Sequence, residues 1–165
     1  MSNKILSIEG LRKHFPVKNV WGTDIALVKA LDGVDLEIEG GKTFGIVGES
    51  GCGKTTLMRT LLRLVEPTSG SVVLSEEITK NQFLSNNLEE LTNEELRSFR
   101  RQIGVVFQDP MGALNPRMLI KDIVSEPLVI HGKTENMRDR VIELLNNVGL
   151  GEEHLYRYPH EFSGG

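Results

Sequence analysis

Eight residues, Gly48 to Thr55 (GESGCGKT), constrain the fold of this chain more than any other stretch of its sequence. They fit the pattern G-x-x-x-x-G-K-[ST] at every fixed position, and they lie between an apolar run and a helical one. Glycines let the backbone adopt left-handed conformations and approach a polyphosphate closely, so that successive amide N–H groups can point inward. The stretch therefore predicts a strand, a phosphate-binding loop and a helix, in that order.

The residue types after the glycines suit the same chemistry. Lys54 supplies a compact cation for the outer phosphates of a nucleotide, and Thr55 opens the following helix, where its hydroxyl can ligate Mg2+. Thr56 offers a second hydroxyl. A dinucleotide-binding turn, the alternative, would place its glycines as G-x-G-x-x-G and needs no Lys-Thr pair. The candidate nucleotide-binding residues of the loop are Gly48, Glu49, Ser50, Gly51, Cys52, Gly53, Lys54, Thr55 and Thr56.

Composition narrows the class of protein further. The 165 residues are 39% apolar and 25% charged, which is ordinary for a globular domain with a core. The net charge of −4 has both signs interspersed and no basic stripe, so nucleic acid is not expected as a partner. The single cysteine, Cys52, excludes an internal disulfide and fits a reducing cytosol. No run approaches the roughly 18 apolar residues of a membrane span, so we expect any membrane contact to be peripheral.

The first half of the chain has the patterning of a β-rich region. Short apolar runs predict strands at 5–15, 25–31, 34–38, 43–47 and 71–74. The run at 43–47 is nearly continuous, which is typical of a strand buried on both faces of a parallel sheet. From Lys54 the period becomes helical as far as Val65, before Pro67 and Gly70 end it. The polar segment 76–93 is expected to be a long surface connection with room for one short helix.

The second half is mostly helical in pattern. Asn93 is expected to cap a helix that runs through Gln102, and 103–107 predicts a strand that proline ends at position 110. Residues 118–130 are apolar-rich and helical in character, with an interruption expected at Pro127. Thr134 is expected to cap a last helix that stops at Gly149. The layout is an α/β part followed by an all-helical part.

Several motifs together resemble the ATP-binding subunits of ABC transporters, in matching order and spacing across nearly the whole chain. They are Phe15, GESGCGKT, VFQDP at 106–110, LNPR at 114–117 and YPHEFSGG at 158–165. The phrases HFPV, VKALDGV, FQDPMGALNPRM and RYPHEFSGG are similar to the oligopeptide and dipeptide importer branch. The resemblance implies an α/β fold, the P-loop NTPase of ABC ATPase type, incomplete at its C-terminus. It further implies a β-rich subdomain with the RecA-like core over 1–110 and a helical subdomain over 111–165.

The resemblance also assigns roles to residues outside the loop. Phe15 matches the aromatic that stacks on adenine, although a strand-end core aromatic is the alternative. Gln108 matches the residue that reaches Mg2+ and the attacking water, so that it joins Lys54 as a catalytic residue and Thr55 as a metal ligand. Ser163, Gly164 and Gly165 match the start of the signature, which binds the γ-phosphate of a nucleotide held by the opposing subunit. The implied cofactors are ATP and Mg2+.

The chain ends inside that signature, so the metal-binding aspartate, catalytic glutamate and switch histidine that the family places downstream are not among its residues. Because phosphoryl transfer needs a positioned metal and an oriented nucleophile, we expect ATP binding with severely impaired hydrolysis. The resemblance also places the strands between 43–47 and 103–107 in the missing part, so we expect a gap in the sheet and exposed strand edges. We favour a truncated piece of a longer protein.

The function that the resemblance implies is to energise import of oligopeptides, dipeptides or a related small solute at the cytoplasmic face of the cell membrane. Its partners would be membrane permease subunits, a second ATP-binding subunit that is identical or homologous, and indirectly an extracytoplasmic solute-binding protein. One alternative is a nucleotide-binding interaction module without turnover. A soluble P-loop kinase or GTPase is less favoured, because the sequence has no guanine-reading N-K-x-D motif.

Overall fold

The computed structural model describes residues 4–79 and 85–162. Two compact units make up the chain, Met1–Gly104 and Val105–Gly165. The division into family subdomains at residue 110 stays a prediction. The signature residues Ser163, Gly164 and Gly165 lie outside the described residues.

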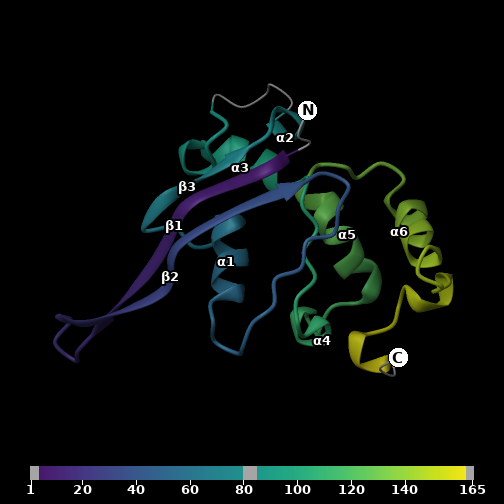
Figure 1. Ribbon diagram of the computed structural model, residues 1–165. Coiled ribbons are helices and arrows are strands. Elements are labelled where there is room, and N and C mark those ends of the chain that lie inside the picture. Colours follow the sequence, from purple (N-terminus) through teal and green to yellow (C-terminus); the bar gives the residue numbers. More distant parts are fainter. Residues whose placement is uncertain (1–3, 80–84, 163–165) are drawn as a thin grey trace. The chain divides into compact units, whose positions relative to one another are not determined.

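A three-stranded antiparallel sheet in the order β2-β1-β3 forms the frame of the first unit (Figure 1). Its strands are β1 (Lys4–Lys18), β2 (Asp24–Glu39) and β3 (Ser69–Leu74). The two strands predicted at 25–31 and 34–38 are one continuous strand, and this prediction was wrong. Gly33, with φ of +84°, lies between Asp32, which pairs with Arg12, and Val34, which pairs with Leu11. The glycine marks a bulge inside β2 rather than its end.

Helices of the first unit pack on this sheet around a single apolar core. They are α1 (Lys54–Leu61), the single-turn α2 (Glu76–Thr79) and α3 (Asn93–Arg100), with a 3-10 turn, η1 (Leu88–Glu90). The segment 76–93 thus has α2 near its start and η1 near its end, while 80–84 lie outside the described residues. The core joins side chains of the strands and helices, chiefly Ile8, Leu11, Leu57, Val72, Leu74, Leu88, Leu96 and Phe99.

Thr92, and not Asn93, caps α3. Its hydroxyl accepts a hydrogen bond from the Glu95 amide, and the Glu95 carboxylate accepts one from the Thr92 amide in return. This reciprocal pair is the capping box, in which a hydroxyl and a carboxylate three residues apart satisfy two free amides. The prediction shifted the cap by one residue because Asn93 is itself a good cap residue.

Helix α1 is shorter than its apolar pattern indicated. It ends at Leu61, and Arg63 takes the left-handed conformation with φ of +49°. The chain then turns back, so that the Leu64 amide donates to the Arg59 carbonyl at 2.8 Å. No glycine or proline marks this stop, which is why the predicted helix extended to Val65.

Neither of the predicted strands at 43–47 and 103–107 is a strand in the structure. Both segments lack regular secondary structure, and no ladder joins them to another described segment. The exposed fraction is 93% for Val47 and 89% for Val106. A parallel strand is ordered by paired neighbours and by cover on both faces, and the described residues supply no paired neighbour. Apolar side chains of both segments are therefore exposed, and the two predicted strands are not formed.

The second unit is helical. It contains α4 (Pro110–Ala113), α5 (Ile120–Ile130), α6 (Met137–Asn146) and the 3-10 turns η2 (Glu152–His154) and η3 (Pro159–Glu161). Its core joins α5, α6 and the segment after η2 through Ile120, Val141, Leu145 and Leu155. Among the described residues, no helix has the length and apolar content needed to cross a membrane.

Two predictions about these helices were wrong. Pro127 lies inside α5 without ending it, because a proline removes only one helical hydrogen bond and apolar packing of Ile123, Val124 and Leu128 holds both sides. Thr134 does not cap α6, whose N-cap is Asn136 in the left-handed conformation, with no capping hydrogen bond from its side chain. Gly149, with φ of +78°, does lie just beyond α6, as expected of a helix stop.

Candidate nucleotide-binding site

The phosphate-loop candidate connects the irregular segment 43–47 to α1, and it is open to solvent. Residues 48–52 are exposed, and Gly53 is the N-cap of the helix with φ of +100° and ψ of 0°. A side chain at Gly53 would meet the carbonyl oxygen of Ala30 on β2, so only glycine allows the loop to approach the strand this closely. The sheet of the first unit therefore supports the loop directly.

Lys54 reaches back across the loop that precedes it. Its ammonium donates hydrogen bonds to the Gly48 carbonyl at 2.8 Å and to the Glu49 carbonyl at 2.6 Å. It also lies 3.4 Å from Cys52 Sγ. These contacts hold a positive charge over the loop and at the first residue of α1. The structure thus brings Lys54 together with the residues that the motif assigns to phosphate binding.

The start of α1 has the electrostatics of an anion site. The first amides of a helix have no carbonyl partner within it, and their dipoles give this end a partial positive charge. No acidic residue occupies the first turn of α1 to neutralise that charge. Thr55 is exposed in this turn, where its hydroxyl could ligate a cation bound with the phosphates, and Thr56 is half-buried.

Sequence reasoning missed the residues that fix the other end of α1. Arg100 of α3 donates hydrogen bonds to the Leu62 carbonyl at 3.1 Å and the Arg63 carbonyl at 2.7 Å, which covers free carbonyls at the helix end. Arg63 in turn donates to the Leu91 carbonyl at 2.7 Å. The sequence showed Arg100 only as a basic residue in the last turn of its own helix. Its contact with a helix that begins 46 residues earlier has no local signal.

Phe15 belongs to the same unit as the loop. It lies on β1 opposite Val28, is 38% exposed, and has the Lys13 ammonium 4.9 Å from its ring centroid. It is therefore not the buried core aromatic that was the alternative. Its adenine-stacking role stays a prediction.

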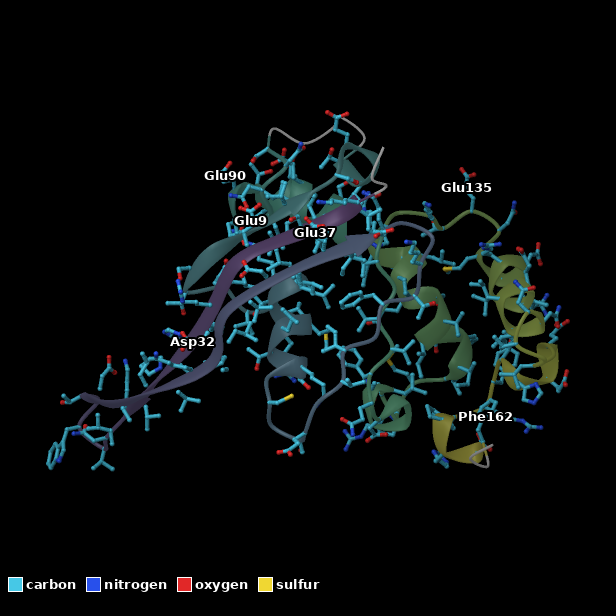
Figure 2. The ribbon with its side chains drawn as sticks, viewed as in Figure 1. Glu9, Asp32, Glu37, Glu90, Glu135 and Phe162 are labelled. Atoms are coloured by element: carbon cyan, nitrogen blue, oxygen red, sulfur yellow. The ribbon has the colours of Figure 1, made fainter. Side chains whose placement is uncertain are left out.

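Asp32, to which the sequence motifs assign no role in binding, lies on β2, the strand that supports the loop (Figure 2). Its carboxylate contacts Lys29 at 3.2 Å and His14 at 3.3 Å. A hydrogen bond from Lys29 lowers the pKa of Asp32, against a smaller opposing effect of burial, and His14 adds to the lowering. The carboxylate is thus ionised at neutral pH and ties the two strands across the sheet.

Gln108 belongs to the second unit, beyond the division after Gly104. It is exposed at a bend between segment 103–107 and α4. Asp109 next to it accepts a hydrogen bond from the Gly112 amide at 2.9 Å, which stabilises the turn into α4. The predicted role of Gln108 at Mg2+ and water remains a prediction.

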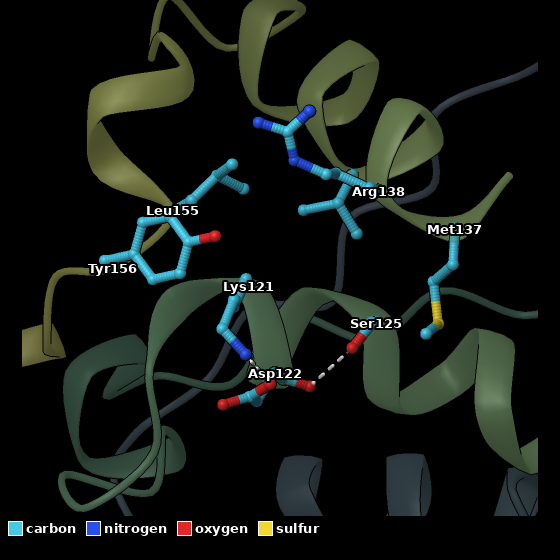
Figure 3. A pocket seen from close by; sticks show the side chains of 8 residues that line it. Lys121, Asp122, Ser125, Met137, Arg138, Leu155 and Tyr156 are labelled. Atoms are coloured by element: carbon cyan, nitrogen blue, oxygen red, sulfur yellow. Dashed lines mark hydrogen bonds and ion pairs between the residues drawn. The ribbon is translucent and has the colours of Figure 1, made fainter.

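The helical unit has a cavity of its own, of about 190 Å³ (Figure 3). Its floor is apolar and includes Val141 and Leu155, which are 2% and 1% exposed. Charged and aromatic side chains lie at its rim, among them Lys121 and Tyr156. A hydrogen bond to Asp122 raises the pKa of Lys121, opposed by partial burial, so this rim position is cationic at neutral pH. The cavity contains none of the predicted site residues.

The glycine loop and the helix with a lysine at its first position define a P-loop nucleotide-binding protein. The family model described as ABC transporter matches residues 31–165. The chain belongs to this family, and it has the fold of the ABC ATPases. This membership argues against the soluble kinase or GTPase.

Individual relatives place the chain more narrowly. It is 44% identical over 168 residues to the oligopeptide transport ATP-binding protein OppF of Bacillus subtilis, a match covering 100% of this chain and 50% of the relative. It is 41% identical over 163 residues to the di/tripeptide transport ATP-binding protein DppF of Pseudomonas aeruginosa, covering 98% and 48%. The chain thus spans about half the length of the curated relatives it matches.

The chain is also similar to solved structures of ABC ATPases. A dimeric structure of the ATP-binding cassette MJ0796, in a post-hydrolysis state with ADP and Pi bound, is similar to this chain with a TM-score of 0.72 and 26% identity. That match covers 96% of this chain and 63% of the cassette.

Proposed function

We propose that this chain is the ATP-binding part of a subunit that energises the import of oligopeptides or dipeptides through a membrane permease. The observation that carries the proposal is Lys54, whose ammonium lies over the loop at the positive end of α1. The peptide as cargo is supported by the names of the relatives, two of which are transport proteins for oligopeptides and for di- and tripeptides.

Within the loop, each group has a distinct task in this proposal. Backbone amides of 48–53 and of the first turn of α1 bind phosphate oxygens, and Lys54 neutralises charge on the outer phosphates. Mg2+ bound with ATP would neutralise further charge, and the Thr55 hydroxyl and Gln108 amide oxygen are the ligands that this chain offers. Both are neutral oxygen donors of the kind that Mg2+ accepts beside phosphates.

In the whole protein, we propose that two such ATP-binding subunits close on ATP and hydrolyse it, and that Gln108 and the helical unit pass this closure to the permease. The complex would lie at the cytoplasmic face of the membrane, with a solute-binding protein acting on the outer side. The second subunit would be either identical or homologous, and Ser163, Gly164 and Gly165 would act on its nucleotide.

The chain itself should bind MgATP without turning it over, because its 165 residues include no counterpart of the family's downstream water-activating groups. Calorimetric titration with MgATP should show saturable binding, while a phosphate-release assay on the same sample should stay at background. Multiple turnovers by the purified chain would contradict the assignment of catalysis to those groups. Absence of nucleotide binding would contradict the proposed function itself and leave the interaction-module alternative.

Phe15→Ala tests the adenine contact. Stacking of a base on an aromatic ring contributes about 1–3 kcal/mol, so the dissociation constant for MgATP should rise about 5- to 150-fold. Binding of inorganic triphosphate should not change, because it has no base. Val17→Ala, at a position on the same strand with nearly the same exposed fraction, 37%, is the matched control. Equal loss of affinity for both ligands would rule out adenine stacking by Phe15.

A further inference from the structure

The far end of the β1–β2 hairpin is an apolar surface with no assigned partner. We call residues 13–30 the arm; in Figure 1 the turn of the arm lies at the free end of the hairpin, away from β3. Val20 is 98% exposed and Trp21 is 88% exposed at this turn. Further exposed apolar side chains follow along both strands, namely Phe15, Val17, Ile25, Leu27 and Val28.

The turn that carries Trp21 is held in one conformation. The Asn19 carboxamide oxygen accepts hydrogen bonds from the amides of Trp21 and Thr23, each at 2.9 Å. The Asn19 amide also donates to the Thr23 carbonyl at 2.9 Å. Because the backbone is already ordered, the turn can present its indole to a partner at a low cost in conformational entropy.

Both faces and both edges of the arm are uncovered by other described strands. Side chains alternate along a strand, so Phe15 and Val28, which pair across the ladder, lie on one face, and Pro16 and Leu27 lie on the other. The ladder between β1 and β3 extends only to Arg12, and β2 is an edge strand of the sheet. A two-stranded ribbon is marginally stable in water, so exposed apolar residues on both its faces favour a partner that covers it.

Charge favours an acidic protein as that partner. The arm carries three lysines, Lys13, Lys18 and Lys29, against one aspartate, Asp24, a net charge of +2. Since the whole chain carries −4, the residues outside the arm carry −6. The acidic remainder of a second copy of this chain therefore complements the arm, and opposite charges speed and orient association.

Length favours a protein over a lipid surface. On the face opposite Phe15, Leu27 pairs with Pro16, which lies four residues from Val20 along β1, about 13 Å at 3.3 Å per residue. A membrane interface buries an apolar element by only about 5–10 Å, which would cover Val20 and Trp21 and leave Leu27 in water. A protein surface can cover the turn together with the Leu27 face, and Phe15 on the other face stays open to a base.

We propose that the arm is a docking element that lies against the acidic body of a second copy of this chain, with Trp21 and Val20 buried in the contact. Nucleotide is not part of this contact, and the proposal stands or falls separately from the proposed ATP binding.

Trp21 is the only tryptophan of the chain, so its fluorescence reports on the contact directly. Sedimentation measurements should show that raising the protein concentration converts monomer to dimer. Over the same concentrations, the fluorescence emission of Trp21 should shift to the blue, and acrylamide should quench it less. The double variant Val20→Ser/Trp21→Ser should weaken self-association at least about tenfold, and Lys18→Glu should weaken it as well. High salt should also weaken self-association, because it screens the attraction between the basic arm and the acidic remainder of the other copy. Val148→Ser, at a 71% exposed position in the other unit, is the control and should dimerise as the original chain does.

Four results would overturn the proposal. The first two are a chain that stays monomeric at every concentration and a dimer in which the Trp21 emission stays at the wavelength of an indole in water. The third is equal dimerisation by the double variant. The fourth is a Trp21 emission that is already blue-shifted in the monomer, which would mean that Trp21 is covered by its own chain. A blue shift produced by phosphatidylserine vesicles without dimer formation would assign the arm to a lipid surface and reject a protein partner. MgATP titration of the double variant should match the original chain, which separates this test from that of nucleotide binding.

Discussion

Lys54→Ala should raise the dissociation constant for MgATP about 10- to 100-fold, because a hydrogen bond to a charged group contributes about 1.5–3 kcal/mol. The variant removes the cation that lies over the loop and the two hydrogen bonds to the carbonyls of Gly48 and Glu49. Titration calorimetry measures the affinity, and urea unfolding of the same samples shows whether the loop's own hydrogen bonds also stabilise the fold.

The control for this variant is Lys42→Ala, which removes an exposed lysine paired with Glu39 a few residues before the loop. It changes the net charge equally and should leave the MgATP affinity within about twofold, since exposed ion pairs contribute little. Equal losses from the two variants would mean that net charge and not the position of Lys54 attracts the nucleotide.

Gly53→Ala should destabilise the first unit by about 3 kcal/mol or more and weaken MgATP binding with it. The left-handed conformation costs a non-glycine residue about 1–2 kcal/mol, and the added methyl group would also collide with the Ala30 carbonyl. Because that carbonyl belongs to the backbone of β2, relief requires the loop to move away from the sheet. Urea unfolding measures the stability loss.

Gly51→Ala separates the two parts of that cost. Gly51 is also left-handed, with φ of +82°, but a methyl group there would meet nothing within 4 Å. The Gly51→Ala variant should therefore lose only the free energy that the left-handed conformation costs, about 1–2 kcal/mol of stability. If both alanine variants unfold at the same urea concentration, the close approach of Gly53 to β2 is not important for stability.

Local patterns predicted much of the fold because the forces behind them are local. Strand structure over β1, β2 and β3 and the helix after the loop follow from apolar periodicity and from the glycine loop, and the structure contains all of them. The same local reasoning placed Lys54 at the start of that helix, next to the loop. The roles of Phe15 and Gln108 stay predictions.

The errors arise where distant residues decide the conformation. Arg63 turns left-handed at the end of α1 while its guanidinium holds the Leu91 carbonyl, a contact between residues far apart in sequence. Segment 43–47 has the composition of a buried strand, but a strand forms only where neighbours pair with it, and composition does not reveal whether they are present. Pro127 suggested a break in α5 that packing overrides.

The loop also contains a thiol that can be labelled chemically. Cys52 is the only cysteine of the chain, it is exposed, and its sulfur lies 3.4 Å from the Lys54 ammonium. A single thiol-reactive dye will therefore attach at the phosphate loop without any engineered residue, while the single indole reports from the hairpin turn. Two optical signals from a chain of natural sequence can therefore follow the loop and the arm in the same sample.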